Sequence, residues 1–88
     1  MNKQYKLNKG FISQKIGNKT TIFSGEDSTL YTLNEVAGFI LESVKLGMGK
    51  ESIALRLTEK YEIDQEKALK DVDDFFEILV KKKIIIKK

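Results

Sequence analysis

The chain contains no cysteine and no histidine, and the two absences exclude several kinds of chemistry. Without cysteine, neither a disulfide framework nor a thiolate metal site can form. Without histidine, the commonest general base and zinc ligand are missing, together with every Ser-His or Cys-His pair. Asp and Glu remain as possible Mg²⁺ ligands or acids, but they need a defined cleft, which a domain of 88 residues rarely has. We therefore expect no catalytic residues, no metal and no cofactor.

Proline and long apolar runs are also absent. The uninterrupted apolar runs, such as Ile84–Ile86, are far too short to span a bilayer. No apolar segment follows Met1, so we expect no secretory signal, a cytoplasmic location and no membrane contact. An apolar fraction of 41% suffices for one core and argues against disorder. The chain is therefore predicted to be a single domain over residues 1–88.

The first third of the sequence has the pattern of β-strands. Residues 11–16 alternate between two faces, and residues 20–23 form a β-branched run; both patterns are typical of strands. Gly17 and Asn18 lie between them and favour a two-residue hairpin turn. We predict a meander of three antiparallel strands, 11–16, 20–23 and 29–33, with a short fourth piece at 5–7.

The rest of the sequence predicts three helices. Residues 32–35 fit a capping box with Thr32 as the N-cap, and Asn34 competes for that position. The first helix ends at Gly47 and Gly49, a second runs from about 50 to 60, and a third runs from an Asp64 cap to about Lys82. Apolar spacing predicts a shared core of Val36, Ile40, Leu57, Val72, Phe76 and Leu79.

A three-stranded antiparallel sheet followed by three helices is an α+β fold of two layers. Its element order resembles a winged helix-turn-helix module with the wing moved in front of the helices. A winged helix usually binds DNA, and its reading helix should be basic. The third helix carries six acids and two lysines before Ile78, and the second is mixed. We therefore expect no nucleic acid, and a DNA-binding winged helix stays the alternative, beside a bare protein-interaction module.

The densest carboxylates are Asp71, Asp73 and Asp74, and a solvated helix face explains them better than a metal site, because isolated carboxylates on a helix seldom close a coordination sphere. The lysines near position 82 suit a helix C-terminus, where cations offset the helix dipole.

A peptide is the ligand that the predicted fold suits best. The strand 29–33 is the last of the meander, so one of its edges should be free to accept an extended peptide as another strand. One flank of the third helix mixes apolar and charged side chains and would face that peptide; the other flank, Leu69 and Val80, is the alternative. The predicted peptide-binding residues are Thr29, Leu30, Tyr31, Thr32, Leu33, Asp71, Phe75, Ile78 and Lys82.

Residues 30–41 resemble the strand-to-helix segment of the PqqD-like family, named for a protein of pyrroloquinoline quinone biosynthesis. Lys83 stands where that family often has Gly before the closing aliphatic residues, which leaves the end of the third helix open. Later positions continue the family's pattern in order: Ile53, Ala54, Leu57, Tyr61, Glu62, Ile63, Asp64, Asp71, Val72, Phe75, Phe76, Leu79, Ile84 and Ile85.

The resemblance implies a winged-helix-like domain without catalysis, the recognition element of pathways that make ribosomally synthesised, post-translationally modified peptides. Such a domain acts as a chaperone that binds the leader of a precursor peptide by strand addition on its third strand, with the third helix as the other wall. It then presents the precursor to a modifying enzyme, a radical S-adenosylmethionine enzyme or a leader peptidase. These partners are implied by the resemblance alone.

Overall fold

A computed structural model describes residues 5–87, which form five strands and three helices. The strands are β1 (Tyr5–Leu7), β2 (Phe11–Ile16), β3 (Lys19–Ser24), β4 (Thr29–Leu33) and β5 (Ile85–Lys87). The helices are α1 (Glu35–Lys45), α2 (Lys50–Tyr61) and α3 (Gln65–Lys81). The predicted fold class, an antiparallel sheet of β2, β3 and β4 followed by three helices, is confirmed. Residues 1–4, the start of the segment expected to lack a secretory signal, lie outside the described residues.

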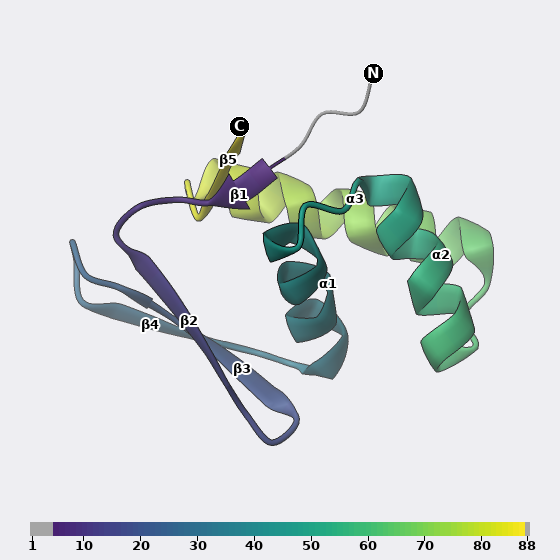
Figure 1. The fold of residues 1–88 in the computed structure, drawn as a ribbon, viewed down its shortest axis with the longest axis horizontal. Helices are drawn as coiled ribbons and strands as arrows, with labels where there is room; N and C mark the ends of the chain where they lie inside the picture. The colour runs from purple at the N-terminus through teal and green to yellow at the C-terminus, as the bar shows by residue number, and fades with distance from the viewer. Residues whose placement is uncertain (1–4, 88) are drawn as a thin grey trace.

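The order of the meander is β2-β3-β4, and its register sorts the side chains onto two faces. Gly17, at the predicted hairpin turn, has a φ of +61°, a conformation that glycine adopts without steric cost. On one face of the central strand, Ile22 is fully buried. All three helices lie to one side of the sheet in Figure 1, and α1 contacts β3 and β4. The face that carries Ile22 is therefore the inner face of the sheet.

Of the two residues predicted to cap the start of α1, Asn34 is the N-cap and Thr32 is not. The N-cap is Asn34, whose Oδ1 accepts a hydrogen bond from the Ala37 N–H at 2.8 Å. Thr32 is still part of β4, where it pairs with Thr21. Its side chain is exposed, because strand alternation turns it to the outer face, away from α1. Thr32 therefore does not cap the helix, and the competing position does.

A single close approach fixes α1 against the sheet. A Cβ on Gly38 would lie 2.5 Å from the Thr20 Oγ1, well inside van der Waals contact, so a larger residue would push the helix away. Thr20 is only 1% exposed. Gly38 therefore lets the backbone of α1 come close to β3.

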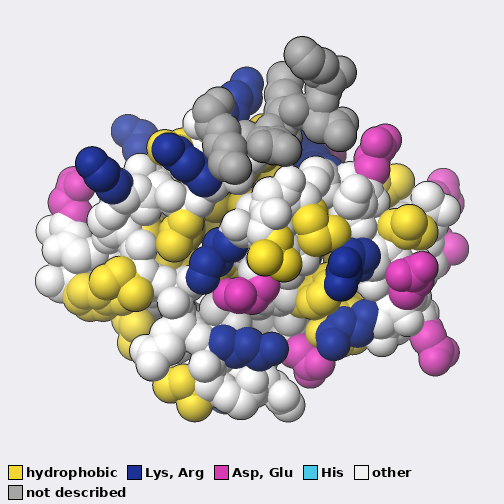
Figure 2. Space-filling model, viewed as in Figure 1, with side chains coloured by type: hydrophobic (Ala, Val, Ile, Leu, Met, Phe, Trp, Pro, Cys, Tyr) yellow, Lys and Arg dark blue, Asp and Glu magenta, His cyan; other side chains and the backbone are white. Residues whose placement is uncertain are grey.

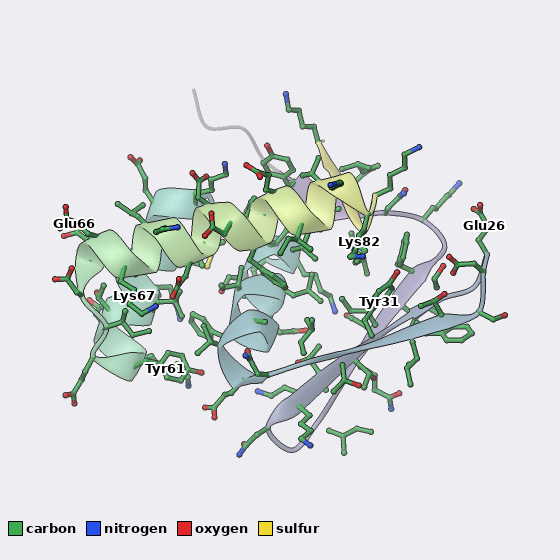
Figure 3. The ribbon with its side chains drawn as sticks, turned by 180° about the vertical axis from the view of Figure 1, so that it is seen from behind. Glu26, Tyr31, Tyr61, Glu66, Lys67 and Lys82 are labelled. Atoms are coloured by element: carbon green, nitrogen blue, oxygen red, sulfur yellow. The ribbon has the colours of Figure 1, made fainter. Side chains whose placement is uncertain are left out.

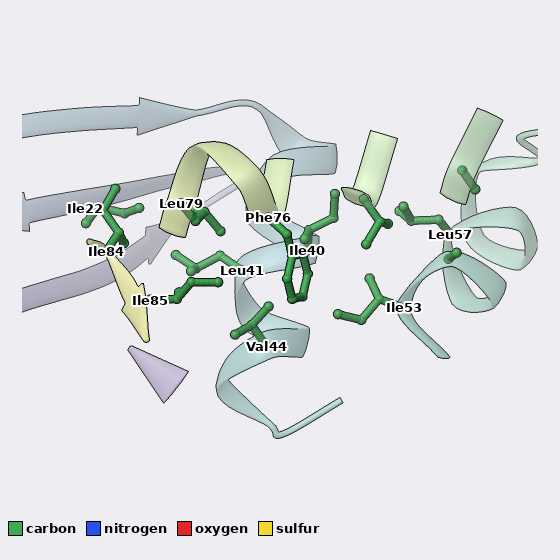
Figure 4. Packing of buried hydrophobic residues seen from close by; sticks show 13 residues of the cluster. Ile22, Ile40, Leu41, Val44, Ile53, Leu57, Phe76, Leu79, Ile84 and Ile85 are labelled. Carbon is green, nitrogen blue, oxygen red and sulfur yellow. The ribbon is translucent and has the colours of Figure 1, made fainter. Parts of the chain in front are cut away.

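The core joins all three helices, β3 and β5. Five of the six predicted core residues, Ile40, Leu57, Val72, Phe76 and Leu79, are at most 2% exposed. Figure 4 shows Phe76 within this cluster, and its ring makes a T-shaped contact with that of Tyr5, with 5.3 Å between the ring centroids. Val36 was predicted in the core but is only partly buried at its margin, because it lines a surface hollow described below.

The short piece at 5–7 is a strand, but it does not join the meander. β1 pairs with β5, with Leu7 opposite Ile85, and the two form a separate sheet. Two hydrogen bonds extend this pairing, since the Asn8 N–H donates to the Ile84 carbonyl and the Asn8 Nδ2 donates to the Lys83 carbonyl, both at 2.8 Å. The isoleucine run at 84–86 was predicted to be too short for a membrane span, and two of its residues belong to the family pattern, but no strand was predicted there.

Helices α1 and α3 end in the same hydrogen-bond pattern. After α1, Gly47 has a φ of +86°, and the Met48 N–H donates to the Ser43 carbonyl. After α3, Lys83 has a φ of +61°, and the Ile84 N–H donates to the Leu79 carbonyl. Both ends are Schellman motifs, in which a left-handed residue turns the chain out of the helix. The third helix therefore ends at Lys81, one residue before the predicted end.

Within residues 5–87, no helix combines the length and the apolar character needed to cross a membrane.

Candidate functional site

The free edge of β4 is the first component of the site. β4 pairs with β3 on one side, and no strand within residues 5–87 pairs with its other side. Alternate residues of such a strand direct their N–H and C=O groups outward, where an extended chain can pair with them. Thr29, Tyr31 and Leu33 are partly buried on the inner face, whereas Leu30 and Thr32 are exposed on the outer face. The side chains of Leu30 and Thr32 therefore point away from the helices. On the side of β4 that faces the helices, these two residues have only main-chain groups available for binding.

The second component is the flank of α3 that faces β4. The Lys82 Nζ lies 5.5 Å from the centroid of the Tyr31 ring, which brings the end of α3 over the middle of β4 (Figure 3). Phe75 is partly buried and packs against the core, and Ile78 is 48% exposed. No carboxylate among the described residues lies within salt-bridge distance of Lys82.

The third component is an open hollow of about 390 Å³. It lies between the start of α1, the α2–α3 loop and the first half of α3. Its size falls within the range of small ligand-binding clefts. Its lining residues are Asn34, Val36, Ala37, Ile40, Ile63, Lys67, Asp71 and Phe75. We call the free edge of β4, the α3 flank 71–82 and this hollow the β4–α3 surface.

Sequence reasoning found only part of this lining. Asp71 and Phe75 were predicted to bind peptide, and the structure places both in the hollow. Val36 and Ile40 were assigned to the core alone, although they also form its floor. Ile63 was missed, yet the sequence carries a signal for it: it is an isolated apolar residue between Glu62 and Asp64, in a loop where nothing else needs an aliphatic side chain.

Three lysines pair with the three aspartates of α3. Asp71 pairs with Lys67 at 3.1 Å, and Asp74 pairs with Lys70 at 3.2 Å, each one helical turn away. Asp73 pairs with Lys50 of α2 at 2.8 Å, and this hydrogen bond raises the pKa of the Lys50 ammonium. Asp71 and Lys67 therefore place a balanced charge pair at the rim of the hollow.

The alternative flank of α3 offers less space. Leu69 and Val80 are 37% and 44% exposed. Val80 lines a hollow of about 180 Å³ together with Tyr5, Lys50 and Phe76. That hollow is lined by Tyr5 of β1 and by residues of α2 and α3, whereas the hollow beside Phe75 includes Asn34, the residue that directly follows β4, so a strand added to β4 would lie nearer to the hollow beside Phe75.

Another hollow of about 180 Å³ lies on the far side of α1, beside the β2–β3 hairpin. Its wall includes Tyr61, whose hydroxyl donates to Glu35 at 3.2 Å. Burial, and then this hydrogen bond, raise the pKa of the Tyr61 hydroxyl. Lys15, Lys60 and Glu42 add further charges, which makes this hollow much more polar than the one beside Phe75.

Residues 20–85 match the family model of coenzyme PQQ synthesis protein D (PqqD). The chain belongs to the PqqD family. The match runs from β3 through the three helices to the start of β5 and contains the whole β4–α3 surface. The family assigned from residues 30–41 is therefore confirmed.

Two solved structures are similar to this PqqD-family chain. One is described as TbiB1 in complex with the TbiA(beta) leader peptide; it is 21% identical with a TM-score of 0.84, and the match covers 91% of this chain and 93% of that one. The other is described as lasso peptide synthetase B1 complexed with the leader peptide; it is 18% identical with a TM-score of 0.87, and the match covers 94% and 98%. At these identities the likeness shows a shared fold. A comparison with curated proteins found no match.

Proposed function

We propose that the chain binds the leader of a ribosomally synthesised precursor peptide as an added strand on β4, with α3 as the second wall. The free edge of β4 beside the apolar hollow carries this proposal. Main-chain hydrogen bonds to an edge strand hold a peptide without regard to its sequence, and pockets for alternate side chains select it. Two proteins of the same fold, both described as bound to a leader peptide, support this choice of ligand.

The hollow beside Phe75 is suited to one or two hydrophobic anchors of the leader. Its floor is aliphatic, formed by Val36, Ala37 and Ile40, and the Lys67–Asp71 pair at its rim can fix the register of a polar neighbour. Lys82 at the other end of the α3 flank adds a cation. The leader therefore lies with its hydrophobic anchors toward the first half of α3.

In this proposal the chain does no chemistry itself. It holds the leader while a separate enzyme, a radical S-adenosylmethionine enzyme or a leader peptidase, acts on the precursor. The family match and the absence of His and Cys support a role in binding.

Fluorescence titrations test the proposal directly. A labelled leader, taken from a small open reading frame beside the gene for this chain, should bind with an affinity that depends weakly on salt. A DNA duplex that carries the same label should not bind at either of two salt concentrations. Tight DNA binding that falls steeply with salt, without leader binding, would instead identify a winged-helix DNA-binding protein.

A further inference from the structure

The outer face of the β2-β3-β4 sheet is nearly free of charge. The register places eight side chains on it: Ile12, Gln14, Ile16, Lys19, Thr21, Phe23, Leu30 and Thr32. Lys19 is the one charged residue among them, although 33% of the chain is charged. Depletion of charge marks the centre of protein–protein interfaces more reliably than overall hydrophobicity does.

The apolar residues of this face form a continuous row. Ile12 lies opposite Phe23, and Phe23 lies opposite Leu30, so the row crosses all three strands in register. Ile12 and Leu30 are 65% and 63% exposed, and Phe23 is 42% exposed. In the space-filling view (Figure 2), separate groups of hydrophobic side chains are exposed over the strands as well as over the helices. The helices pack against the opposite face, so no described element covers the row.

The row ends at the strand that is proposed to receive the leader. In a strand pair, directly opposed residues direct their side chains to the same face. A leader residue opposite Leu30 would therefore extend the row by one side chain. Alternate leader residues would face the β4–α3 surface, and the others would face outward beside Leu30.

The size of the patch argues against a partner that uses the sheet alone. A stable interface buries roughly 800 Å² on each partner, more than the four exposed apolar side chains of this face, Ile12, Ile16, Phe23 and Leu30, provide, so two copies packed through this face would associate weakly. A lipid surface needs a cluster of cations, and Lys19 is the only cation on this face. A leader strand bound beside β4 would supply the additional interface area that the sheet alone does not provide.

We propose that the peptide-modifying enzyme docks on the outer face of this sheet, through an apolar and charge-poor surface, and contacts the outward side chains of the bound leader at the same time. This inference rests on the proposed leader binding. The enzyme then distinguishes the loaded protein from the empty one, because only the loaded protein presents the complete face.

A charge-pair variant tests this docking surface. In I12K/F23E the new side chains lie directly opposite each other, so their attraction supports the strand pair, and the net charge does not change. The matched control is L46K/L55E, which also exchanges two exposed apolar residues, 78% and 53% exposed, for a lysine and a glutamate, but away from the sheet, since Leu46 is the C-cap of α1 and Leu55 lies in α2. Circular dichroism checks that each variant is folded. If I12K/F23E does not fold, I16E replaces it, since the new carboxylate lies opposite Lys19.

The measurement is the affinity for the enzyme encoded beside the precursor gene, with and without saturating leader. We expect leader to tighten enzyme binding to the parent at least tenfold, and I12K/F23E to lose that gain while its leader affinity stays within twofold. L46K/L55E should match the parent. Unchanged enzyme affinity in I12K/F23E overturns the docking surface. A parent dimer that I12K/F23E dissociates also overturns it, in favour of self-association. Absence of leader binding in the parent rejects the proposed function itself.

Discussion

At the scale of single residues, the left-handed backbone conformation costs free energy at Lys83 but not at Gly47. Both follow a helix in the left-handed conformation of a Schellman motif, and in that conformation the Cβ of an L-residue crowds its own backbone. We expect Lys83→Gly to raise the free energy of unfolding by about 0.5–1 kcal/mol. Gly47→Ala should lower it by a similar amount. Thermal melts of both variants check this, and a lower melting temperature for Lys83→Gly would contradict it.

Lys82, one position earlier, should affect binding more than stability. Its ammonium lies over the Tyr31 ring, at the end of the β4–α3 surface where no described carboxylate pairs with it. Lys82→Met keeps most of the stem, so we expect leader affinity to fall by about 0.5–1 kcal/mol and to depend less on salt. Lys81→Met, the neighbouring residue on the same helix, is the control. Equal losses in both variants would mean that only the net charge matters.

At the scale of elements, α3 divides two roles between adjacent residues. Phe76 is 2% exposed in the core, whereas Phe75 lines the hollow. Phe76→Ala should cost about 3–5 kcal/mol, a large part of a small domain's stability, as measured by urea unfolding. Phe75→Ala should weaken leader binding by about 1–3 kcal/mol with a nearly unchanged melt. If Phe76→Ala melts within one or two degrees of the parent, the orientation of α3 is wrong.

The sequence predicted the local elements well, because strand alternation, Gly17 in the hairpin and the apolar spacing of α3 are written in neighbouring residues. It did not predict the pairing of β1 with β5, because that contact joins residues near opposite ends of the described chain and Ile84–Ile86 shows no alternation. The hollow was predicted only in part for the same reason. Ile63 reaches Val36 and Phe75 through the folding of three segments, and no local pattern encodes their meeting.

At the scale of the whole molecule, the position of the β4–α3 surface predicts which amide resonances a bound leader shifts. Adding leader to the labelled protein should shift the amide resonances most at Leu30–Leu33 and along Asp71–Lys82, because these two segments form the free edge and the helical wall of the β4–α3 surface. The Gly17–Asn18 hairpin, at the far end of β2 and β3, should move little. A heteronuclear NMR titration checks this. If the largest shifts occurred at that hairpin instead, the peptide would bind at the β2 edge. The proposed site would then be wrong, even if leader binding itself persists.

The pairing of β1 with β5 also determines the order in which parts of the chain can fold during synthesis. β1 is synthesised before every other described element, but its partner strand leaves the ribosome only after α3. Until then, the meander and the helices can form, while β1 remains a strand without a neighbour and the Tyr5 side of Phe76 stays uncovered. Contacts between distant parts of a chain are slow to form, because closing the long loop between them costs entropy. Among the described elements, the β1–β5 pair is therefore the last that can form, and a chain that stalls before β5 leaves part of its core open to aggregation.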